Sequence, residues 1–116
     1  MSTVHDIISA KHRRMEFLWN SKQLKEMVMS IYTPDAQLFY FGDLHIKGHD
    51  EILHDFETNY EPNLQLTLIE ILNVSDDYIM VLSAYKTSAE GHYQSIWKKT
   101  GEDWKMVREF CNDILN

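Results

Sequence analysis

The stretch "YTPDAQLFYFGDLHIKGHDEILHDF", residues 32–56, contains the end of one helix, two short strands and the start of another helix. Pro34 has no backbone N–H and disfavours helical geometry in the residue before it, so a preceding helix ends here. The segments 37–41 and 44–47 are rich in aromatic and branched residues, which favours two strands around a turn at Gly42-Asp43. The secondary structure before and after the stretch is therefore considered from these elements outward.

The second half of the stretch predicts a helix over residues 49–60. Gly48 opens it, and the acids of its first turn suit the positive end of the helix dipole. Pro62 closes it, because proline cannot continue the hydrogen-bonding pattern. The apolar face at helical spacing consists of Ile52, Leu53, Phe56 and Tyr60.

Three histidines in the stretch raise the question of a metal site. His49 and His54 are five residues apart, which places them about 140° apart around a helix. A zinc-binding pair on a helix needs a spacing of three or four residues. His45 lies on the predicted strand instead. We therefore interpret His49 as half-buried and His54 as solvent-facing, and we expect no metal and no cofactor.

Two amphipathic helices precede the stretch. Residues 3–19 have helical periodicity, and Thr3 with Asp6 forms a capping pair. A break at 20–22 is followed by a second apolar face. The apolar positions are Val4, Ile7, Ile8, Met15, Leu18 and Trp19 in the first helix, and Leu24, Met27, Val28, Ile31 and Tyr32 in the second.

Four long strands joined by short turns follow the stretch: 64–74, 78–88, 92–100 and 103–111. Helices first and strands afterwards predict an α+β fold, with three helices packed on a curved antiparallel sheet. The chain has no repeat and no low-complexity tract, so we interpret residues 1–116 as one domain.

The first two of these strands are apolar on both alternating faces, whereas a sheet with one face in water alternates apolar and polar residues. Leu66, Leu68 and Leu72 alternate with Ile69 and Ile71. The helices can cover only one face. We therefore expect a homodimer in which a second copy covers the open sheet face.

Composition excludes several classes of partner. The 116 residues carry a net charge of −7, which argues against nucleic acid, because phosphate binding needs clustered Lys and Arg. No run approaches the roughly 18 apolar residues of a membrane helix. The N-terminal segment has no apolar signal core, and the single cysteine, Cys111, cannot form an internal disulfide. We therefore expect a cytoplasmic protein.

The spacing of several residues then suggests a known family. Tyr32, Asp35 and Ala36 precede the predicted hairpin, and Gly48 with Ile52 opens the following helix. Near the end, Trp97 is followed by Gly101 and by "WKMV" at 104–107. This order resembles the nuclear transport factor 2-like superfamily, particularly its SnoaL-like branch.

The resemblance implies a cone-shaped α+β fold with an apolar cavity between the helices and the concave sheet, usually in a dimer. It does not imply one function. In the ketosteroid isomerase branch, the position of the catalytic aspartate corresponds to Tyr40, which cannot act as a carboxylate base. The position of the oxyanion-hole tyrosine falls near Glu16, beside Met15 and Phe17. Catalysis by the isomerase route is therefore disfavoured, and whether the protein is an enzyme stays open.

The last two strands supply most of the candidate cavity residues. Regular pairing across their turn places Trp97 opposite Met106, Ser95 opposite Arg108, and Tyr93 opposite Phe110. The cavity candidates from this pair are Tyr93, Ser95, Trp97 and Arg108. Relatives of the SnoaL-like branch often carry polar or basic residues at two of these positions. An arginine among aromatic residues would suit an anionic ligand, unless its side chain reaches solvent or an acid at the sheet edge.

Two further candidates come from the first half of the chain. Lys11 falls in the apolar stripe of the first helix, where it either enters the cavity or extends to the surface. Tyr40 presents its hydroxyl either to a ligand or to a partner in the core. Glu70 is a cavity acid or a rim residue. We expect a cavity that binds a small, partly apolar molecule, with an anionic group as one option. The alternatives are a SnoaL-like enzyme (isomerase, dehydratase or cyclase type) acting on a carbonyl compound and a dimerisation or adaptor domain without a ligand.

Overall fold

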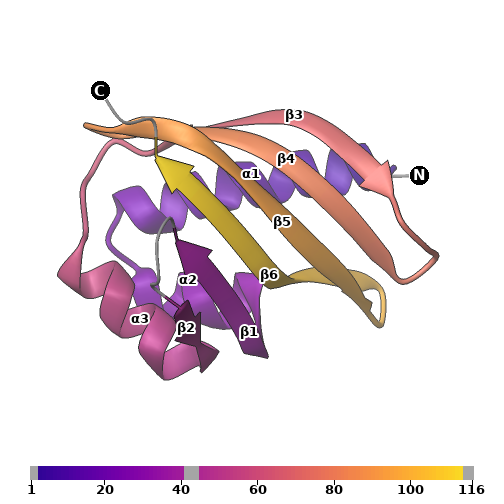
Figure 1. Ribbon diagram of the computed structural model, residues 1–116, viewed down its shortest axis with the longest axis horizontal. Helices are drawn as coiled ribbons and strands as arrows, with labels where there is room; N and C mark the ends of the chain where they lie inside the picture. Colours follow the sequence, from indigo (N-terminus) through magenta and orange to yellow (C-terminus); the bar gives the residue numbers. More distant parts are fainter. Residues whose placement is uncertain (1–2, 41–44, 114–116) are drawn as a thin grey trace.

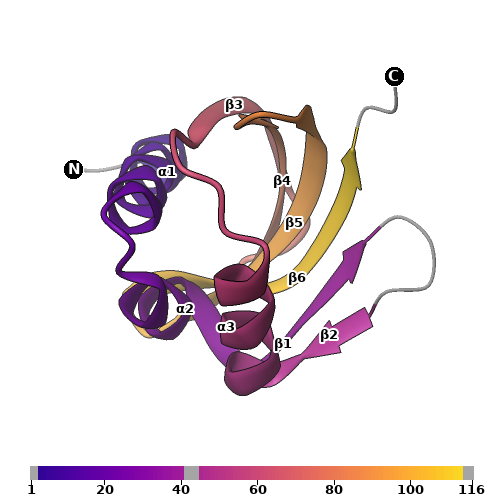
Figure 2. The ribbon, with the colours of Figure 1, turned by 90° about the vertical axis from the view of Figure 1, so that its left-hand side faces the viewer.

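The computed structural model describes residues 3–40 and 45–113 and places three helices on one face of a six-stranded sheet (Figure 1). The helices are α1 (Val4–Asn20), α2 (Leu24–Ile31) and α3 (Gly48–Thr58); the strands are β1 (Tyr32–Tyr40), β2 (His45–Lys47), β3 (Gln65–Asn73), β4 (Tyr78–Lys86), β5 (Glu90–Thr100) and β6 (Asp103–Asp113). Figure 2 shows the sheet curving around the side on which the helices lie. The predicted α+β class with three helices on a curved sheet is confirmed.

The helix boundaries follow the local signals in the sequence. The Thr3 hydroxyl accepts a hydrogen bond from the Asp6 N–H at 3.1 Å, and the Asp6 carboxyl accepts one from the Thr3 N–H, so the capping pair is present. Gly48 begins α3 with a φ of +80°, a conformation that residues with side chains rarely adopt. None of the helices in the described ranges is long and apolar enough to cross a lipid bilayer. The predicted turn at Gly42-Asp43 lies outside the described residues.

The sheet contains one strand pairing that the sequence did not predict, between β1 and β6. The strand order is β2-β1-β6-β5-β4-β3, and β1 runs parallel to β6, so the sheet is mixed. Tyr32, which we assigned to the second helix, already belongs to β1 and pairs with Met106. Turn signals reveal antiparallel neighbours, whereas a parallel pair joins segments far apart in the sequence. The sequence pattern therefore could not show this contact.

A β-bulge changes the register of the last two strands. The predicted pair Trp97–Met106 is present, but Ile96 pairs with Arg108, so Val107 is an extra residue in β6. Beyond this point Ser95 lies opposite Glu109, not opposite Arg108. Successive residues of a strand point to opposite faces, so one inserted residue exchanges the inward and outward sets.

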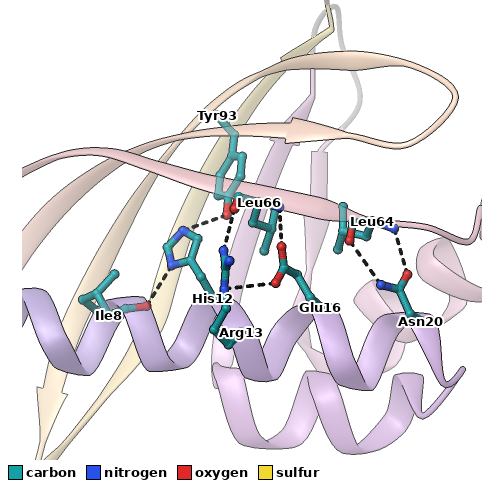
Figure 3. Close-up of polar contacts among 8 residues, drawn as sticks. All are labelled: Ile8, His12, Arg13, Glu16, Asn20, Leu64, Leu66 and Tyr93. Atoms are coloured by element: carbon teal, nitrogen blue, oxygen red, sulfur yellow. Dashed lines mark hydrogen bonds and ion pairs between the residues drawn. The ribbon is translucent and has the colours of Figure 1, made fainter.

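Side chains of α1 bind the backbone of the edge strand β3 (Figure 3). Arg13 Nη2 donates to the Leu66 carbonyl at 2.6 Å, and Glu16 Oε2 accepts from the Leu66 N–H at 2.7 Å. Asn20 bonds both backbone groups of Leu64, the residue just before β3, at 3.1 and 2.8 Å. These contacts satisfy backbone groups that an edge strand leaves free, and they fix α1 along the rim of the concave face.

Removing one of these contacts is expected to destabilise the protein. Glu16→Ala leaves the Leu66 N–H without a partner, so the free energy of unfolding should fall by about 1–3 kcal/mol, while Glu16→Gln keeps an acceptor and should cost less. Urea denaturation measures both. Arg14→Ala is the control: its ion pair with Glu26 is exposed and 3.6 Å long, and the change should stay within about 0.5 kcal/mol. Equal losses for Glu16→Ala and Arg14→Ala would contradict the role of this contact.

Candidate functional site

A cavity of about 460 Å³ lies between the helices and the concave face of the sheet. Its lining is largely aromatic and apolar, with three carboxyl groups. The aromatic residues are Trp19, Tyr32, Tyr40, Phe56, Tyr85 and Tyr93, and the acids are Asp55, Glu61 and Glu109. A concave, mostly apolar cavity with few polar groups is typical of a small-molecule site.

The sheet register explains why Glu109 and Tyr40 face this cavity. Residues directly opposite each other on neighbouring strands share a face. One inward row across four strands consists of Val81, Ser95, Glu109 and Leu38, and the next consists of Ser83, Tyr93, Cys111 and Tyr40. The bulge at Val107 places Glu109 and Cys111 of β6 in these rows. Glu109 is thus the residue that the regular pairing assigned to the outer face.

Glu109 is the most unusual group of the cavity, because it is an acid that is only 8% exposed. Tyr32 Oη donates to its Oε1 at 3.1 Å, and no other described residue donates to its carboxyl. Burial raises the pKa of Glu109 to about 7; the hydrogen bond from Tyr32 opposes this shift and the charge of Asp55 adds to it. Both the protonated and the ionised form are therefore accessible near neutral pH.

A second carboxyl is held by Tyr40. Its hydroxyl donates to Asp55 Oδ2 at 3.0 Å, and the Asn59 side chain donates to Asp55 Oδ1 at 2.9 Å. Burial, with the nearby charge of Glu109, raises the pKa of Tyr40, so its phenol stays protonated. The Asp55 carboxyl is thus fixed at one wall by two donors.

Tyr93 connects the cavity to a buried histidine on α1. His12 is 1% exposed; its Nδ1–H donates to the Ile8 carbonyl at 2.9 Å, which leaves Nε2 to accept from Ser83 Oγ at 2.9 Å. Tyr93 Oη lies 3.4 Å from the same nitrogen (Figure 3). Burial lowers the pKa of His12, so the ring is neutral at neutral pH. The sequence interpretation missed His12, although its position four residues after Ile8 marks the inward face of the helix.

Two more groups of the lining lack strong partners. The Tyr85 hydroxyl is buried and makes no hydrogen bond with the described residues. Burial, with the charge of Glu109 second, raises the pKa of Cys111 to about 12. This thiol is therefore a poor nucleophile, because the reactive form of cysteine is the thiolate.

The structure separates the residues that the sequence proposed for the cavity. Tyr40 and Tyr93 line it. Ser95 and Trp97 are fully buried next to it and belong to the core, where Trp97 Nε1 donates to Ser95 Oγ at 2.9 Å. Whether any of them binds a ligand stays a prediction.

The two basic candidates lie outside the cavity. The Lys11 ammonium forms an ion pair with Asp103, the first residue of β6, at an N–O distance of 2.8 Å. The inward position on this turn of α1 is occupied by His12. Arg108 lies on the outer face as a result of the bulge, and its guanidinium donates to the Val107 carbonyl at 2.7 Å. Glu70 is exposed and pairs with Leu82 on the same outer face. Among the described residues no Lys or Arg lines the cavity, so the reason to expect an anionic ligand is gone.

The three histidines of the opening stretch lie apart from one another. His45 bonds Gln37 and stacks on Phe39, His49 bonds the Tyr32 carbonyl, and His54 is exposed. The predicted half-buried His49 and solvent-facing His54 are confirmed. Across residues 3–40 and 45–113, no three His, Cys, Asp or Glu side chains gather as metal ligands would.

Glu109→Gln is expected to stabilise the protein at alkaline pH. The unfolded chain ionises Glu109 near its ordinary pKa of 4.5, whereas the folded protein holds the proton up to about 7. The stability that Glu109 contributes is therefore fully present below pH 4.5 and lost as pH rises through 7. Wild type loses about 3 kcal/mol of unfolding free energy in this way, and Glu109→Gln, which has no ionisable group at this position, does not.

This prediction is checked by urea denaturation of wild type and Glu109→Gln at about pH 5 and about pH 8. The free energy of unfolding of wild type is subtracted from that of the variant at each pH. This subtraction removes the contribution of His12, whose effect on stability changes with pH in the opposite direction. Its lowered pKa stabilises the fold above its ordinary value of 6.5, and this contribution is lost as pH falls. A variant that gains no stability between the two pH values would contradict the buried, uncompensated state of Glu109.

No family model and no curated protein sequence matches the chain. Solved structures match it over nearly its whole length. It is similar to an NTF-2 like protein of unknown function from Shewanella oneidensis, with a TM-score of 0.84, 20% identity, and coverage of 96% of this chain and 100% of that chain. It is also similar to a ketosteroid isomerase-like protein from Erwinia carotovora atroseptica, with a TM-score of 0.77, 17% identity, and coverage of 95% of both chains.

A third similar structure is a domain of unknown function with a cystatin-like fold from Nostoc punctiforme. Its TM-score is 0.77 at 20% identity, and the match covers 99% of this chain and 81% of that chain. At such identities the likeness concerns the fold alone. The fold is therefore that of nuclear transport factor 2-like proteins, as the sequence resemblance implied.

Proposed function

Starting from a nuclear transport factor 2-like fold that encloses a cavity, we propose that this protein binds a small, mostly apolar molecule carrying one polar group. The observation that carries this proposal is the cavity itself, about 460 Å³ in volume with an aromatic lining. Tyrosine hydroxyls and the carboxyls of Asp55 and Glu109 converge on it from α3 and from strands β1, β4, β5 and β6, which is the pattern of a site that orients one ligand.

Blocking the cavity tests this function. Ala89 lines the cavity in the turn between β4 and β5 and is exposed, so Ala89→Trp should occupy its mouth without disturbing the core. Lys86→Trp, at the exposed end of β4 outside the lining, is the matched control. A set of neutral, cationic and anionic aromatic fragments is screened by saturation-transfer NMR. Fragments that bind wild type and Lys86→Trp but not Ala89→Trp would support the proposal; no binding by any fragment would overturn it.

A second candidate function is proton transfer on a carbonyl compound. Glu109, with its pKa near 7 and its free oxygen, has the acidity that a general acid or base needs at neutral pH. The test is deuterium incorporation next to the carbonyl of cyclic ketones in D₂O, followed by NMR. Faster exchange with wild type than with Glu109→Gln would favour catalysis. Equal exchange rates would overturn the catalytic function, and binding would remain as the proposed function.

We also propose that the protein is a homodimer through the outer sheet face. This face carries Leu72, Tyr78 and Phe110, each more than a third exposed, and the three helices of the described residues lie on the opposite face (Figure 2). Burial of such a surface against a second copy would remove it from water. Native mass spectrometry of the 13.8 kDa chain tests this, with Leu72→Glu as the interface variant and Phe17→Glu, on exposed α1 surface, as the control. A monomer in wild type would overturn the dimer.

A further inference from the structure

We infer that the cavity selects a protonated amine on an apolar body, and that the Glu109 carboxyl holds the ammonium group. This inference rests on the proposed binding function and specifies its ligand. Three observations carry it: the sign of the charges in the lining, the hydrogen-bonding groups that remain unused, and the aromatic rings around them.

The lining has acids and no base among the described residues. Glu109 and Asp55 line the cavity together with the exposed Glu61, while Lys11 pairs with Asp103 and Arg108 bonds the Val107 carbonyl. An ionised carboxyl on a residue that is only 8% exposed, with a single phenol as its donor among the described residues, is poorly compensated. A ligand cation next to it would supply the missing charge, whereas an anion would add repulsion.

The unused hydrogen-bonding capacity also fits an ammonium group. The hydroxyls of Tyr32 and Tyr40 already donate to carboxyls of the lining. What remains free is chiefly acceptor capacity: Oε2 of Glu109 accepts nothing from the described residues, and the buried Tyr85 Oη has no partner. An ammonium has three donors and no acceptor, so it matches these oxygens. A ligand anion would need several donors, and among the described tyrosines of the lining only Tyr85 still has an unused O–H.

The aromatic part of the lining suits a cation with an apolar body. The rings of Trp19 and Phe56 pack edge to face with 5.3 Å between their centroids, and the centroids of the Tyr32 and Phe56 rings are 5.9 Å apart. Ring faces attract a partly desolvated cation, and the same rings bury the hydrocarbon part of the ligand. The cavity therefore combines a carboxyl that can pair with the ammonium group and aromatic rings that can bury the apolar part of the ligand.

The experiment compares three probes with one body: naphthylmethylamine, naphthylmethanol and naphthoic acid. Isothermal titration calorimetry at about pH 8 should give the amine a Kd at least about tenfold below that of the alcohol, with no binding of the acid. Glu109→Gln should weaken the amine about tenfold and leave the alcohol within about twofold. Glu70→Gln, which removes the same charge from the outer sheet face, is the matched control and should change neither.

The outcomes separate this inference from the function on which it rests. If amine and alcohol bind equally and Ala89→Trp abolishes both, the amine preference is overturned and the binding function stands. If the acid binds best, or if none of the three binds while other fragments do, the inference is likewise overturned. If no fragment binds at all, the proposed function fails with it.

A pH series supplies a readout that a merely structural role of Glu109 would not give. The groups facing this carboxyl are Tyr32 and Tyr40 from β1, Asp55 from α3, Tyr93 from β5 and Cys111 from β6. The amine stays protonated between about pH 6 and 8 while Glu109 becomes ionised, so its affinity should rise roughly tenfold over that range. The rise should vanish in Glu109→Gln. An affinity that falls with pH would instead indicate a neutral ligand accepting from protonated Glu109, and would overturn the inference.

Discussion

Trp97→Ala is expected to lower the free energy of unfolding by about 3–5 kcal/mol, because it removes the largest fully buried side chain of the sheet. Trp97 is 0% exposed and lies between Ile79 and Met106 in an inward row of the sheet. Its loss leaves a hole that packed neighbours fill only in part. The variant also frees Ser95 Oγ from the indole N–H, and that hydroxyl is itself buried.

The loss is large for a chain of this size, since domains of about 100 residues are stable by only about 5–15 kcal/mol. Urea denaturation followed by circular dichroism measures it. Phe17→Ala is the matched aromatic control, because Phe17 is 62% exposed on α1 and its removal should cost less than about 0.5 kcal/mol. A loss below about 1 kcal/mol for Trp97→Ala would show that this row is not the packed centre of the fold.

Tyr32→Ala is the second large effect, with an expected loss of about 3–5 kcal/mol. The ring is 1% exposed and packs edge to face against Phe56, and its hydroxyl is the only described donor to Glu109. The variant therefore removes packing and hydrogen bonding together. Comparison with Tyr32→Phe separates the two contributions.

Tyr32→Phe keeps the ring and should show a loss that depends on pH. Near pH 5 Glu109 is protonated, and losing a neutral hydrogen bond should cost about 1 kcal/mol. Near pH 8 the carboxylate loses the Tyr32 donor, and the cost should rise to about 2 kcal/mol. Urea denaturation at both pH values measures this. The double variant Tyr32→Phe with Glu109→Gln is the control and should remove the pH dependence. A loss from Tyr32→Phe that is the same at both pH values would contradict the coupling between the two groups.

Much of the fold could be predicted because its signals are local. The capping pair of Thr3 and Asp6, the stop before Pro34 and the helix opened by Gly48 each depend on residues within one turn of the chain. The α+β class followed from the order of these elements. The turns between the last four strands likewise fixed their antiparallel pairing.

The cavity could be predicted only in part. Tyr40 and Tyr93 were placed by strand alternation, and they line it. The regular pairing placed Arg108 opposite Ser95, and that pairing was wrong, because Val107 is an extra residue in β6. Glu109 was missed for the same reason. For Lys11 the sequence left both the cavity and the surface open. Packing against the sheet turns His12 inward, and Lys11 forms its ion pair with Asp103.

The sequence by itself determined the order of the helices and strands and most of their boundaries, because capping, turn and periodicity signals act between near neighbours in the chain; the start of β1 at Tyr32 is the exception. Tertiary structure decided the sign of charge in the cavity. Side chains of a strand alternate between faces, so a single bulge decides whether an arginine or a glutamate faces inward, and no pattern of apolar residues distinguishes the two. The parallel contact between β1 and β6 then brings Tyr32 to Glu109 across 77 positions of the chain, a pairing that only the folded sheet creates.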